Sequence, residues 1–400
     1  MAEQQRRGVL LLLGLLSVCG QELGEVEYET MLLEKQLRFA RLQLEESRLR
    51  HEVDMRKAAL GAAAEHLGKS DAPPPRKKPA YLWDGVSPRP LVKIVVWNKI
   101  RGYLDWLRSD FTSAAARRCS TECIFSADRS LEASGFVFHA KTHSARDFPK
   151  TKKGIYILAS LEQEKYAPLL TQPRYLAKFD ATATYRLDST LPMTTIPPHW
   201  DADAYFSPSG EIPFAQKKNA AVAFVSNCKN AGAEDRLRFL QELMAHYPVH
   251  SYGRCLHNAD DNDESQDRSA RKRQIVAQYK FYLAFENNKN ATDYVSEKVF
   301  DGLLSASLPV YRGTDSVRKL LPAHDAIVDA RAFNDDPKAL ATHLRHLAAN
   351  QSAYDAYFHW RRRPDDDQNK ASFQAVLDMT AYKFTALCRI CAFVVSDGLT

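Results

Sequence analysis

The chain has 400 residues, of which 45% are hydrophobic and 26% charged, and its formal net charge is +6. This length allows two packed domains with appendages, and the composition is that of an ordinary globular protein. The basic excess is scattered over short runs at 6–7, 76–78, 271–273 and 361–363. A nucleic-acid-binding protein would gather it into one stripe, so we expect no nucleic-acid partner and only a modest bias towards anionic ligands.

A targeting signal occupies residues 1–24. Arg6 and Arg7 precede an apolar run over residues 8–19. As a helix this run spans about 18 Å, which is short of the roughly 30 Å core of a bilayer. Positive charge followed by a short apolar run is typical of a signal peptide, and a signal-anchor in a thin early-secretory membrane is the alternative. Both interpretations place the rest of the chain in a lumen.

A stalk and a linker follow the targeting signal. Residues 25–67 carry apolar side chains in steps of three and four, with interruptions at Glu46 and Arg56. This spacing predicts an N-terminal helical stalk, either a coiled coil that makes a homodimer or a single solvated helix. Residues 68–90 are rich in proline, which predicts a stiff linker.

Six of the seven cysteines lie beyond the targeting signal, which contains Cys19. In an oxidising lumen all six are disulfide candidates, with the connectivity open: Cys119, Cys123, Cys228, Cys255, Cys388 and Cys391. The CxxC motif at 388–391 could indicate a redox or zinc site. No second CxxC motif completes a tetrahedral ligand set, so a structural disulfide is the better interpretation.

The globular part begins with an apolar run at 91–97, as expected of a strand buried on both faces of a parallel sheet. Strand-like segments then alternate with helical ones. We predict further strands at 135–139, 154–159, 180–187, 220–226, 249–252, 280–286 and 308–313. We predict helices at 233–246, 271–279, 294–306 and 337–349. The alternation predicts an α/β fold with two Rossmann-like parallel-sheet domains, at 91–215 and 216–350, and a helical segment at 351–400.

The segment 281–313 carries the chemistry. Its strand ends at Glu286, and a polar loop leads to a helix that Thr292 or Asp293 could cap. The carboxyl end of a strand next to a helix N-terminus is where α/β domains bind nucleotides.

The spacing of Tyr294, Glu297 and Lys298 places these side chains on one face of the predicted helix. Lys298 can meet a diphosphate, and Glu297 can accept hydrogen bonds from sugar hydroxyls. Tyr294 and Asn287 can contact other parts of a nucleotide. An ordinary surface pairing on an amphipathic helix is the alternative that spacing alone leaves open.

The sequence FYLAFENNKNATDYVSEK at 281–298 resembles the donor-binding signature of the α1,3-fucosyltransferase family, which runs close to FYLAFENS…DYITEK. The stretches VSNC at 225–228, SYGRC at 251–255 and TATYRLDST at 182–190 are also similar to family motifs, as are CSTECIFSADRS, GFVFHA and CRIC. The resemblance covers roughly residues 90–391 and implies a GT-B fold, in which two domains face a crevice. Gln163 stands where the family commonly has Ser, Ser296 stands for Thr, and TATYRLDST lacks the family's Trp and second Arg.

The resemblance implies a glycosyltransferase that moves L-fucose from GDP-β-L-fucose to a GlcNAc hydroxyl of a glycoprotein glycan, in α1,3 linkage and with inversion. It favours Glu162 over the nearby Glu164 as the catalytic base. It implies that Arg236 and Lys298 hold the departing diphosphate. Tyr252 is a further donor-binding candidate.

Tyr185, Arg186 and Asp188 are candidates for sugar contacts or for hydrogen bonding between the domains. The acidic stretches at 201–203 and 260–264 are better explained as solvated loops than as metal sites. We therefore expect no metal site and no obligatory cofactor, with a divalent cation such as Mn²⁺ as an optional stimulant.

Several alternatives stay open. The chain could use another nucleotide sugar, or it could be a non-catalytic glycan-binding protein of the same fold. The acceptor could be the core GlcNAc of an N-glycan or N-acetyllactosamine. We expect a single-pass type II protein of the Golgi membrane with a luminal catalytic domain, or a soluble luminal or secreted protein if the signal is cleaved.

Two sequons are N-glycosylation candidates, at Asn290 and Asn350. We expect Asn350 to be modified. A glycan at Asn290 would obstruct the predicted nucleotide loop.

Overall fold

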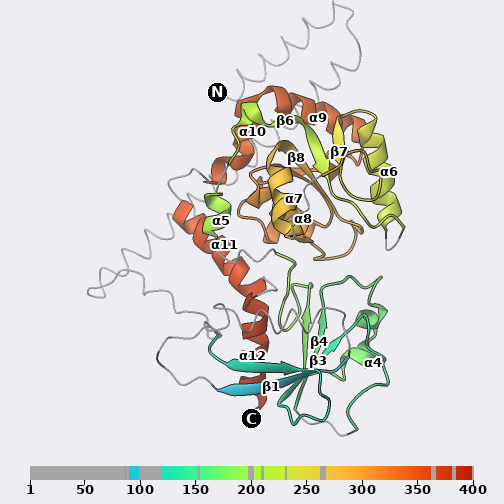
Figure 1. The fold of residues 1–400 in the computed structure, drawn as a ribbon, viewed down its shortest axis with the longest axis vertical. Helices are drawn as coiled ribbons and strands as arrows, with labels where there is room; N and C mark the ends of the chain where they lie inside the picture. Colours follow the sequence, from blue (N-terminus) through green and yellow to red (C-terminus); the bar gives the residue numbers. More distant parts are fainter. Residues whose placement is uncertain are drawn as a thin grey trace, which may run out of the picture. The chain divides into compact units, whose positions relative to one another are not determined.

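The computed structural model describes residues 86, 90–98, 119–150, 154–196, 202–208, 211–229, 232–261, 267–361, 366–380 and 384–398 (Figure 1). They belong to one compact unit, Lys78–Thr400. The predicted signal segment, the stalk and nearly all of the linker lie outside the described residues, so these remain predictions.

The first sheet has five parallel strands in the order β2-β1-β3-β4-β5. The strands are β1 (Leu91–Val96), β2 (Glu122–Ser126), β3 (Gly135–His139), β4 (Ile155–Ser160) and β5 (Ala181–Thr184). The central strands β3 and β4 are apolar almost throughout because both of their faces are covered. The short helix α4 (Pro173–Leu176) contributes Tyr175 to the core on one of these faces, which also contains Phe138 and Tyr156.

The second sheet also has five parallel strands, in the order β10-β9-β8-β6-β7. The strands are β6 (Lys218–Ala223), β7 (Val249–Ser251), β8 (Tyr279–Phe285), β9 (Leu308–Arg312) and β10 (Val328–Asp329). Apolar residues of α6 (Ala233–Met244) and α9 (Pro337–Ala349) form a core with Phe281, Leu283 and Phe285 on one face. On the other face lie α7 (Arg268–Ala277) and α8 (Glu297–Leu304), which pack on Tyr282 and Ala284 respectively.

The C-terminal segment contributes side chains to the cores of both sheets. It comprises α10 (Gln351–Asp355), α11 (Asp366–Thr380) and α12 (Phe384–Gly398). Phe373 of α11 joins the core around α8, where it meets Tyr205 of the short helix α5 (Asp203–Phe206) edge to face. In contrast, α12 lies beside β1 (Figure 1) and buries Leu387 and Ile390 in the core of the first sheet.

The six cysteines after residue 24 form three disulfides. Cys228 pairs with Cys255, whereas Cys119 pairs with Cys388 and Cys123 with Cys391. The predicted disulfides are therefore confirmed, and the CxxC motif does not close on itself. Both of its cysteines join α12 to the segment at the start of β2.

The two parallel sheets confirm the predicted α/β class and its GT-B arrangement of two Rossmann-like sheets. No helix among the described residues combines the length and the apolar character that a bilayer span requires. The predicted anchor at 8–19 lies outside this part of the chain. The described part also holds no group of three or more His, Cys, Asp or Glu side chains arranged to bind a metal ion.

Candidate functional site

The helix that carries the donor motif begins later than the sequence predicts. α8 starts at Glu297 with Ser296 at its N-cap position, not at Tyr294. Asp293 does not cap the helix. It adopts a left-handed conformation with φ of 61°, and its carboxylate accepts a hydrogen bond from the Leu187 N–H at 3.1 Å. Tyr294 therefore precedes the helix instead of sharing a helical face with Glu297 and Lys298.

Lys298 lies between two carboxylates. Its Nζ donates to Ser296 Oγ at 2.8 Å and stands 3.5 Å from Glu297 Oε1 and 3.9 Å from Glu286 Oε2. Glu286 follows β8 and is only 1% exposed. Its Oε1 accepts the Ser296 N–H at 2.7 Å, and its Oε2 has no hydrogen-bond partner among the described residues. Burial raises the pKa of Glu286, although Lys298 opposes this effect.

Glu297 remains an anion at neutral pH. Burial alone would raise its pKa, but Lys298 and Lys272 outweigh that effect and lower the pKa to about 2. Lys272 comes from α7 and contacts Glu297 at 3.5 Å and Asp301 at 2.7 Å. An ionised, partly exposed carboxylate here can accept hydrogen bonds from hydroxyl groups.

Arg236 brings a buried cation to the site. It is 3% exposed, and its terminal nitrogens donate to the backbone oxygens of Phe285 at 3.3 Å and Asn227 at 2.9 Å. Its Nε has no hydrogen-bond partner among the described residues. Burial lowers the pKa of Arg236, whereas Glu286, Tyr294 and nearby groups raise it. The arginine therefore brings a positive charge and a buried, unpartnered N–H to this region.

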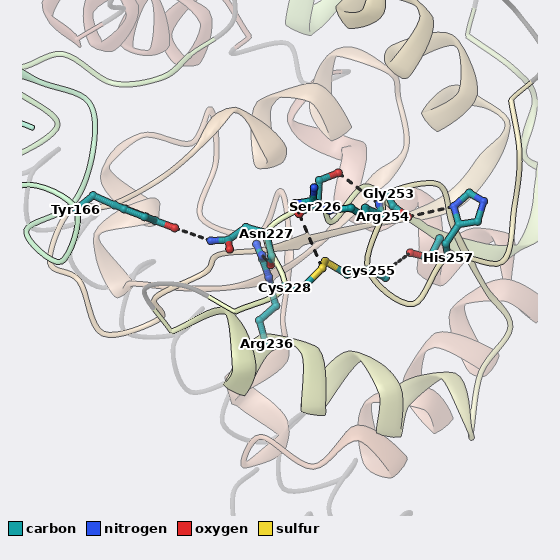
Figure 2. Close-up of a disulfide and its surroundings, with 10 residues drawn as sticks. Tyr166, Ser226, Asn227, Cys228, Arg236, Gly253, Arg254, Cys255 and His257 are labelled. Carbon is teal, nitrogen blue, oxygen red and sulfur yellow. Dashed lines mark hydrogen bonds between the residues drawn. A yellow bond between two sulfur atoms is a disulfide. The ribbon is translucent and has the colours of Figure 1, made fainter. Parts of the chain in front are cut away.

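The Cys228–Cys255 disulfide supports this arginine (Figure 2). It joins the segment after β6 to the segment after β7. Arg254 donates to the Ser226 backbone oxygen at 2.7 Å, which ties the same two segments together. A Cβ on Gly253 would overlap the backbone of Val225, so only glycine permits this close crossing. The backbone oxygen of Asn227 is thereby placed to hold Arg236 (Figure 2).

Glu162 lies just beyond the end of β4 in the first sheet. Its backbone is fixed by Ser160, whose Oγ accepts the Glu162 N–H at 3.1 Å and donates to the Glu162 oxygen at 2.9 Å. Its half-exposed carboxylate contacts Lys141 Nζ at 3.3 Å. Burial raises the pKa of Tyr294, and the charges of Glu286 and Glu162 add to the rise. Glu162 also directly precedes Gln163, whose side chain hydrogen-bonds to Asn287.

Three contacts join the first sheet to the donor loop at 287–295 or to its surroundings. Asn227 Nδ2 donates to the Tyr166 hydroxyl at 2.5 Å (Figure 2). Gln163 Nε2 donates to Asn287 Oδ1 at 3.3 Å, and Asn288 Nδ2 donates to Gln163 Oε1 at 2.6 Å. The structure thus brings the predicted Glu162, Arg236, Asn287, Tyr294, Glu297 and Lys298 into one region.

The second group of candidates borders this region. The ring of Tyr185 meets that of Tyr294 edge to face, with 5.4 Å between centroids. Arg186 forms a two-pronged ion pair with Asp188, at 3.2 and 2.9 Å, and stands 3.8 Å from Asp293. The contact with Asp293 favours an interdomain role over a sugar contact for Arg186, whereas Asp188 pairs with Arg186 within its own turn.

Tyr252 does not join the charged residues. Its ring stacks on Phe224 at 5.3 Å, and its hydroxyl lies 3.1 Å from that of Tyr279. Both sequon asparagines are exposed. Asn350 also accepts the Ala353 N–H and caps α10.

Sequence reasoning missed four residues that build the site: Gln163, Asn288, Glu286 and Lys272. Glu286 follows a fully apolar strand, which could have marked it as a carboxylate at the sheet's carboxyl edge. Lys272 lies in a basic run that resembles solvated surface. No local spacing connects Gln163 with Asn288, because they come from different sheets.

Two family models match the chain. "Fucosyltransferase, N-terminal" matches residues 89–195, and "Glycosyltransferase family 10 (fucosyltransferase) C-term" matches residues 214–399. Together they cover both sheets and α12.

Known proteins resemble the chain over much of its length. It is 31% identical over 288 residues to "GDP-fucose protein O-fucosyltransferase 3" of Danio rerio, covering 68% of this chain and 60% of that protein. It is 30% identical over 240 residues to "Alpha-(1,3)-fucosyltransferase B" of Drosophila melanogaster, covering 56% and 53%. The chain thus spans about half to three fifths of the length of these two relatives.

A solved structure is also similar. The crystal structure of an α1,3-fucosyltransferase with GDP matches with a TM-score of 0.49 at 16% identity, covering 72% of this chain and 91% of that one.

Proposed function

Because this chain belongs to glycosyltransferase family 10, the fucosyltransferase family, we propose that it transfers L-fucose from GDP-β-L-fucose to an acceptor hydroxyl with inversion. One observation carries the proposal. Gln163, the residue after Glu162 in the first sheet, hydrogen-bonds to Asn287 of the second. On either side of Asn287, Arg236 donates to the Phe285 backbone oxygen and Lys298 stands 3.9 Å from Glu286.

The reaction is a single displacement. The acceptor oxygen attacks the anomeric carbon of fucose, and Glu162 takes the hydroxyl proton. The bond from that carbon to the diphosphate oxygen breaks, and its electron pair leaves with GDP. Arg236 and Lys298 stabilise the charge that develops on the diphosphate, and the ionised Glu297 accepts hydrogen bonds from donor hydroxyls.

The test of the base compares Glu162→Gln with Glu164→Gln in the full chain. Glu164 is the matched control, since it lies two residues away and stands 4.0 Å from Arg186. We expect Glu162→Gln to lower turnover by about 10²–10⁴-fold and to leave the Kd for GDP within a few-fold. Retention of most turnover by Glu162→Gln, or an equal loss in both variants, would remove Glu162 from the base role.

For the acceptor we propose a hydroxyl of a protein side chain, supported by the zebrafish relative named as a protein O-fucosyltransferase. The second candidate is the GlcNAc hydroxyl of a glycan in α1,3 linkage, supported by the donor motif and by the Drosophila relative. The two differ in one measurement. Reductive β-elimination releases fucose from a serine or threonine hydroxyl as free fucitol, whereas fucose on the GlcNAc of an N-glycan stays attached to that sugar.

The same assay separates the donor alternatives. The full chain is incubated with GDP-fucose and with other nucleotide sugars, each with folded proteins, N-glycans and lactosamine acceptors. Turnover of GDP-fucose supports the proposal. Turnover of another donor alone would favour a transferase that uses another nucleotide sugar. Nucleotide binding without any turnover would favour a non-catalytic glycan-binding protein.

We propose that no metal ion is obligatory, because Arg236 and Lys298 supply the positive charge that a metal supplies in other transferases. Substantial activity should remain in EDTA. A complete loss that Mn²⁺ restores would contradict this proposal.

We propose a luminal location in the Golgi. Three disulfides support an oxidising compartment. Carbonate extraction of membranes distinguishes a retained anchor from a cleaved signal. The homodimer through the stalk also stays a proposal, to be tested by light scattering of the full chain with and without residues 25–67.

A further inference from the structure

Gln163 makes a paired contact between the two sheets. It is the residue after Glu162, and its side chain is 0% exposed. The nitrogen and the oxygen of its side-chain amide each form a hydrogen bond with one of two consecutive residues of the donor loop. Nε2 donates to Asn287 Oδ1 at 3.3 Å, and Oε1 accepts from Asn288 Nδ2 at 2.6 Å. We call this set of two hydrogen bonds the amide clasp.

The backbone of Gln163 is fixed as well. Its carbonyl oxygen accepts the N–H groups of Tyr166 at 2.9 Å and Ala167 at 3.1 Å. The residue before it, Glu162, is held by Ser160. The clasp therefore ends on a rigid turn on one side and on the donor loop on the other.

The donor loop carries donor-binding candidates at each end. Asn287 receives one bond of the clasp, and α8 with Glu297 and Lys298 follows the loop. Gly232, at the start of α6, packs so closely on the Asn287 carbonyl that a Cβ would overlap it. The amide clasp on Asn287 and Asn288, together with the close packing of Gly232, therefore holds the loop against both sheets.

We infer that Gln163 is a positioning residue that sets the distance between the Glu162 carboxylate and the fucose donor. This inference rests on the proposed function. In the proposed reaction Gln163 does not touch the reacting atoms. It acts through the clasp, because a misplacement of about 1 Å between reacting groups can cost about 10²-fold in rate. Serine, the common family residue at this position, is too short to form either bond.

The test is a double-mutant cycle in the full chain: Gln163→Ala, Asn288→Ala and both together. Lys165→Ala is the matched control, since Lys165 is exposed two residues beyond Gln163. We expect each clasp variant to lower the kcat of transfer about 10- to 100-fold and to change the Kd for GDP less than about threefold. The double variant should be no slower than the slower single variant.

A second readout separates positioning from loss of structure. With Gln163→Ala, more of the GDP-fucose consumed should be hydrolysed by water relative to transfer, because water needs no aligned acceptor. Gln163→Ser should behave like Gln163→Ala. Transfer within twofold of the wild type, effects of the two substitutions that multiply, or transfer and hydrolysis that fall in proportion would overturn the inference.

The outcomes separate the inference from the proposed function. If the wild type turns over GDP-fucose and Glu162→Gln does not, an active Gln163→Ala overturns the inference alone. If the wild type has no turnover, the proposed function fails, and amide hydrogen exchange over 287–295 still tests the clasp. Faster exchange in Gln163→Ala supports the clasp, and unchanged exchange overturns it.

Discussion

At the scale of single residues, Glu286 shows how a buried carboxylate is tolerated. One oxygen accepts the Ser296 N–H at the start of α8, and the other stands 3.9 Å from Lys298. Burial raises its pKa, so the fold penalises its charged form. The hydrogen bond to Ser296 therefore contributes more to the stability of the fold than the negative charge of Glu286 does.

We predict that Glu286→Ala destabilises the protein by about 1–3 kcal/mol, because the buried Ser296 N–H loses its acceptor. Glu286→Gln keeps an acceptor oxygen and removes a poorly solvated charge, so it should cost much less at neutral pH. Urea unfolding of both variants measures the difference. Equal losses would show that the charge matters more than the hydrogen bond.

Glu297 has the opposite electrostatic character. Lys298 and Lys272 outweigh burial and lower its pKa from the usual 4.5 to about 2. A lowered carboxyl pKa contributes stability that is fully present above the unfolded-state value, and that is lost as the pH falls towards the folded-state value.

We predict that the difference in Tm between the wild type and Glu297→Gln is constant from about pH 8 to about pH 5 and shrinks between about pH 4 and pH 2. The control is Glu234→Gln, because Glu234 is exposed on α6. Thermal unfolding across this pH range makes the measurement. A difference that grows on acidification would contradict the assigned ion pairs.

The residues that could be predicted from sequence are those that lie close together along the chain. Glu297 and Lys298 follow a strand and open a helix, which is a pattern with a physical meaning. Gln163 and Asn288 could not be paired in this way, because their contact joins residues 125 positions apart. A side-chain amide carries no periodicity that would reveal its partner.

At the scale of elements, Gly232 determines how α6 meets the donor loop. It occupies the N-cap position with φ of 90°, which L-residues rarely adopt. We predict that Gly232→Ala destabilises the fold by about 1–3 kcal/mol and weakens GDP binding, because its Cβ displaces the Asn287 carbonyl. Calorimetric titration with GDP checks this result, with Lys229→Ala as an exposed control. Unchanged affinity would separate α6 from the donor site.

Most strands were predictable, and α6 and α9 begin where predicted, whereas α7 and α8 each begin three residues away from the predicted start and β2 and β10 were not predicted. Continuous apolar runs identified β1, β3, β4, β8 and β9, since both faces of a parallel sheet are buried. β2 was missed because it is an edge strand whose exposed residues, Glu122 and Ile124, alternate with buried ones. α8 begins three residues later than predicted because the Asp293 carboxylate bonds Leu187 instead of capping the helix.

At the scale of the whole molecule, the C-terminal helix is the feature that local patterns could not place. α12 is apolar enough to predict burial, but its sequence does not indicate which of the two sheets it covers. It returns to β1, roughly 300 residues earlier in the chain. Two disulfides fix this return, with sequence separations of 269 and 268 residues.

These two disulfides close almost the same long loop. In the chain-entropy model a loop of this length is worth roughly 5 kcal/mol, whereas a ring of fewer than ten residues is worth roughly 2–3 kcal/mol. With either disulfide in place, the other closes only the short ring between 119–123 and 388–391. The long loop therefore opens only when both are removed.

We predict that removing either disulfide alone, as Cys119→Ala with Cys388→Ala or as Cys123→Ala with Cys391→Ala, costs roughly 2–3 kcal/mol. Removing both should cost more than the sum of the two single losses. Alanine is chosen because all four cysteines are buried, where a serine hydroxyl would need a partner. Calorimetry on the three variants makes the comparison. Additive losses would mean that the two disulfides act independently and that the packing of α12, not the shared loop, holds the chain's return to the first sheet.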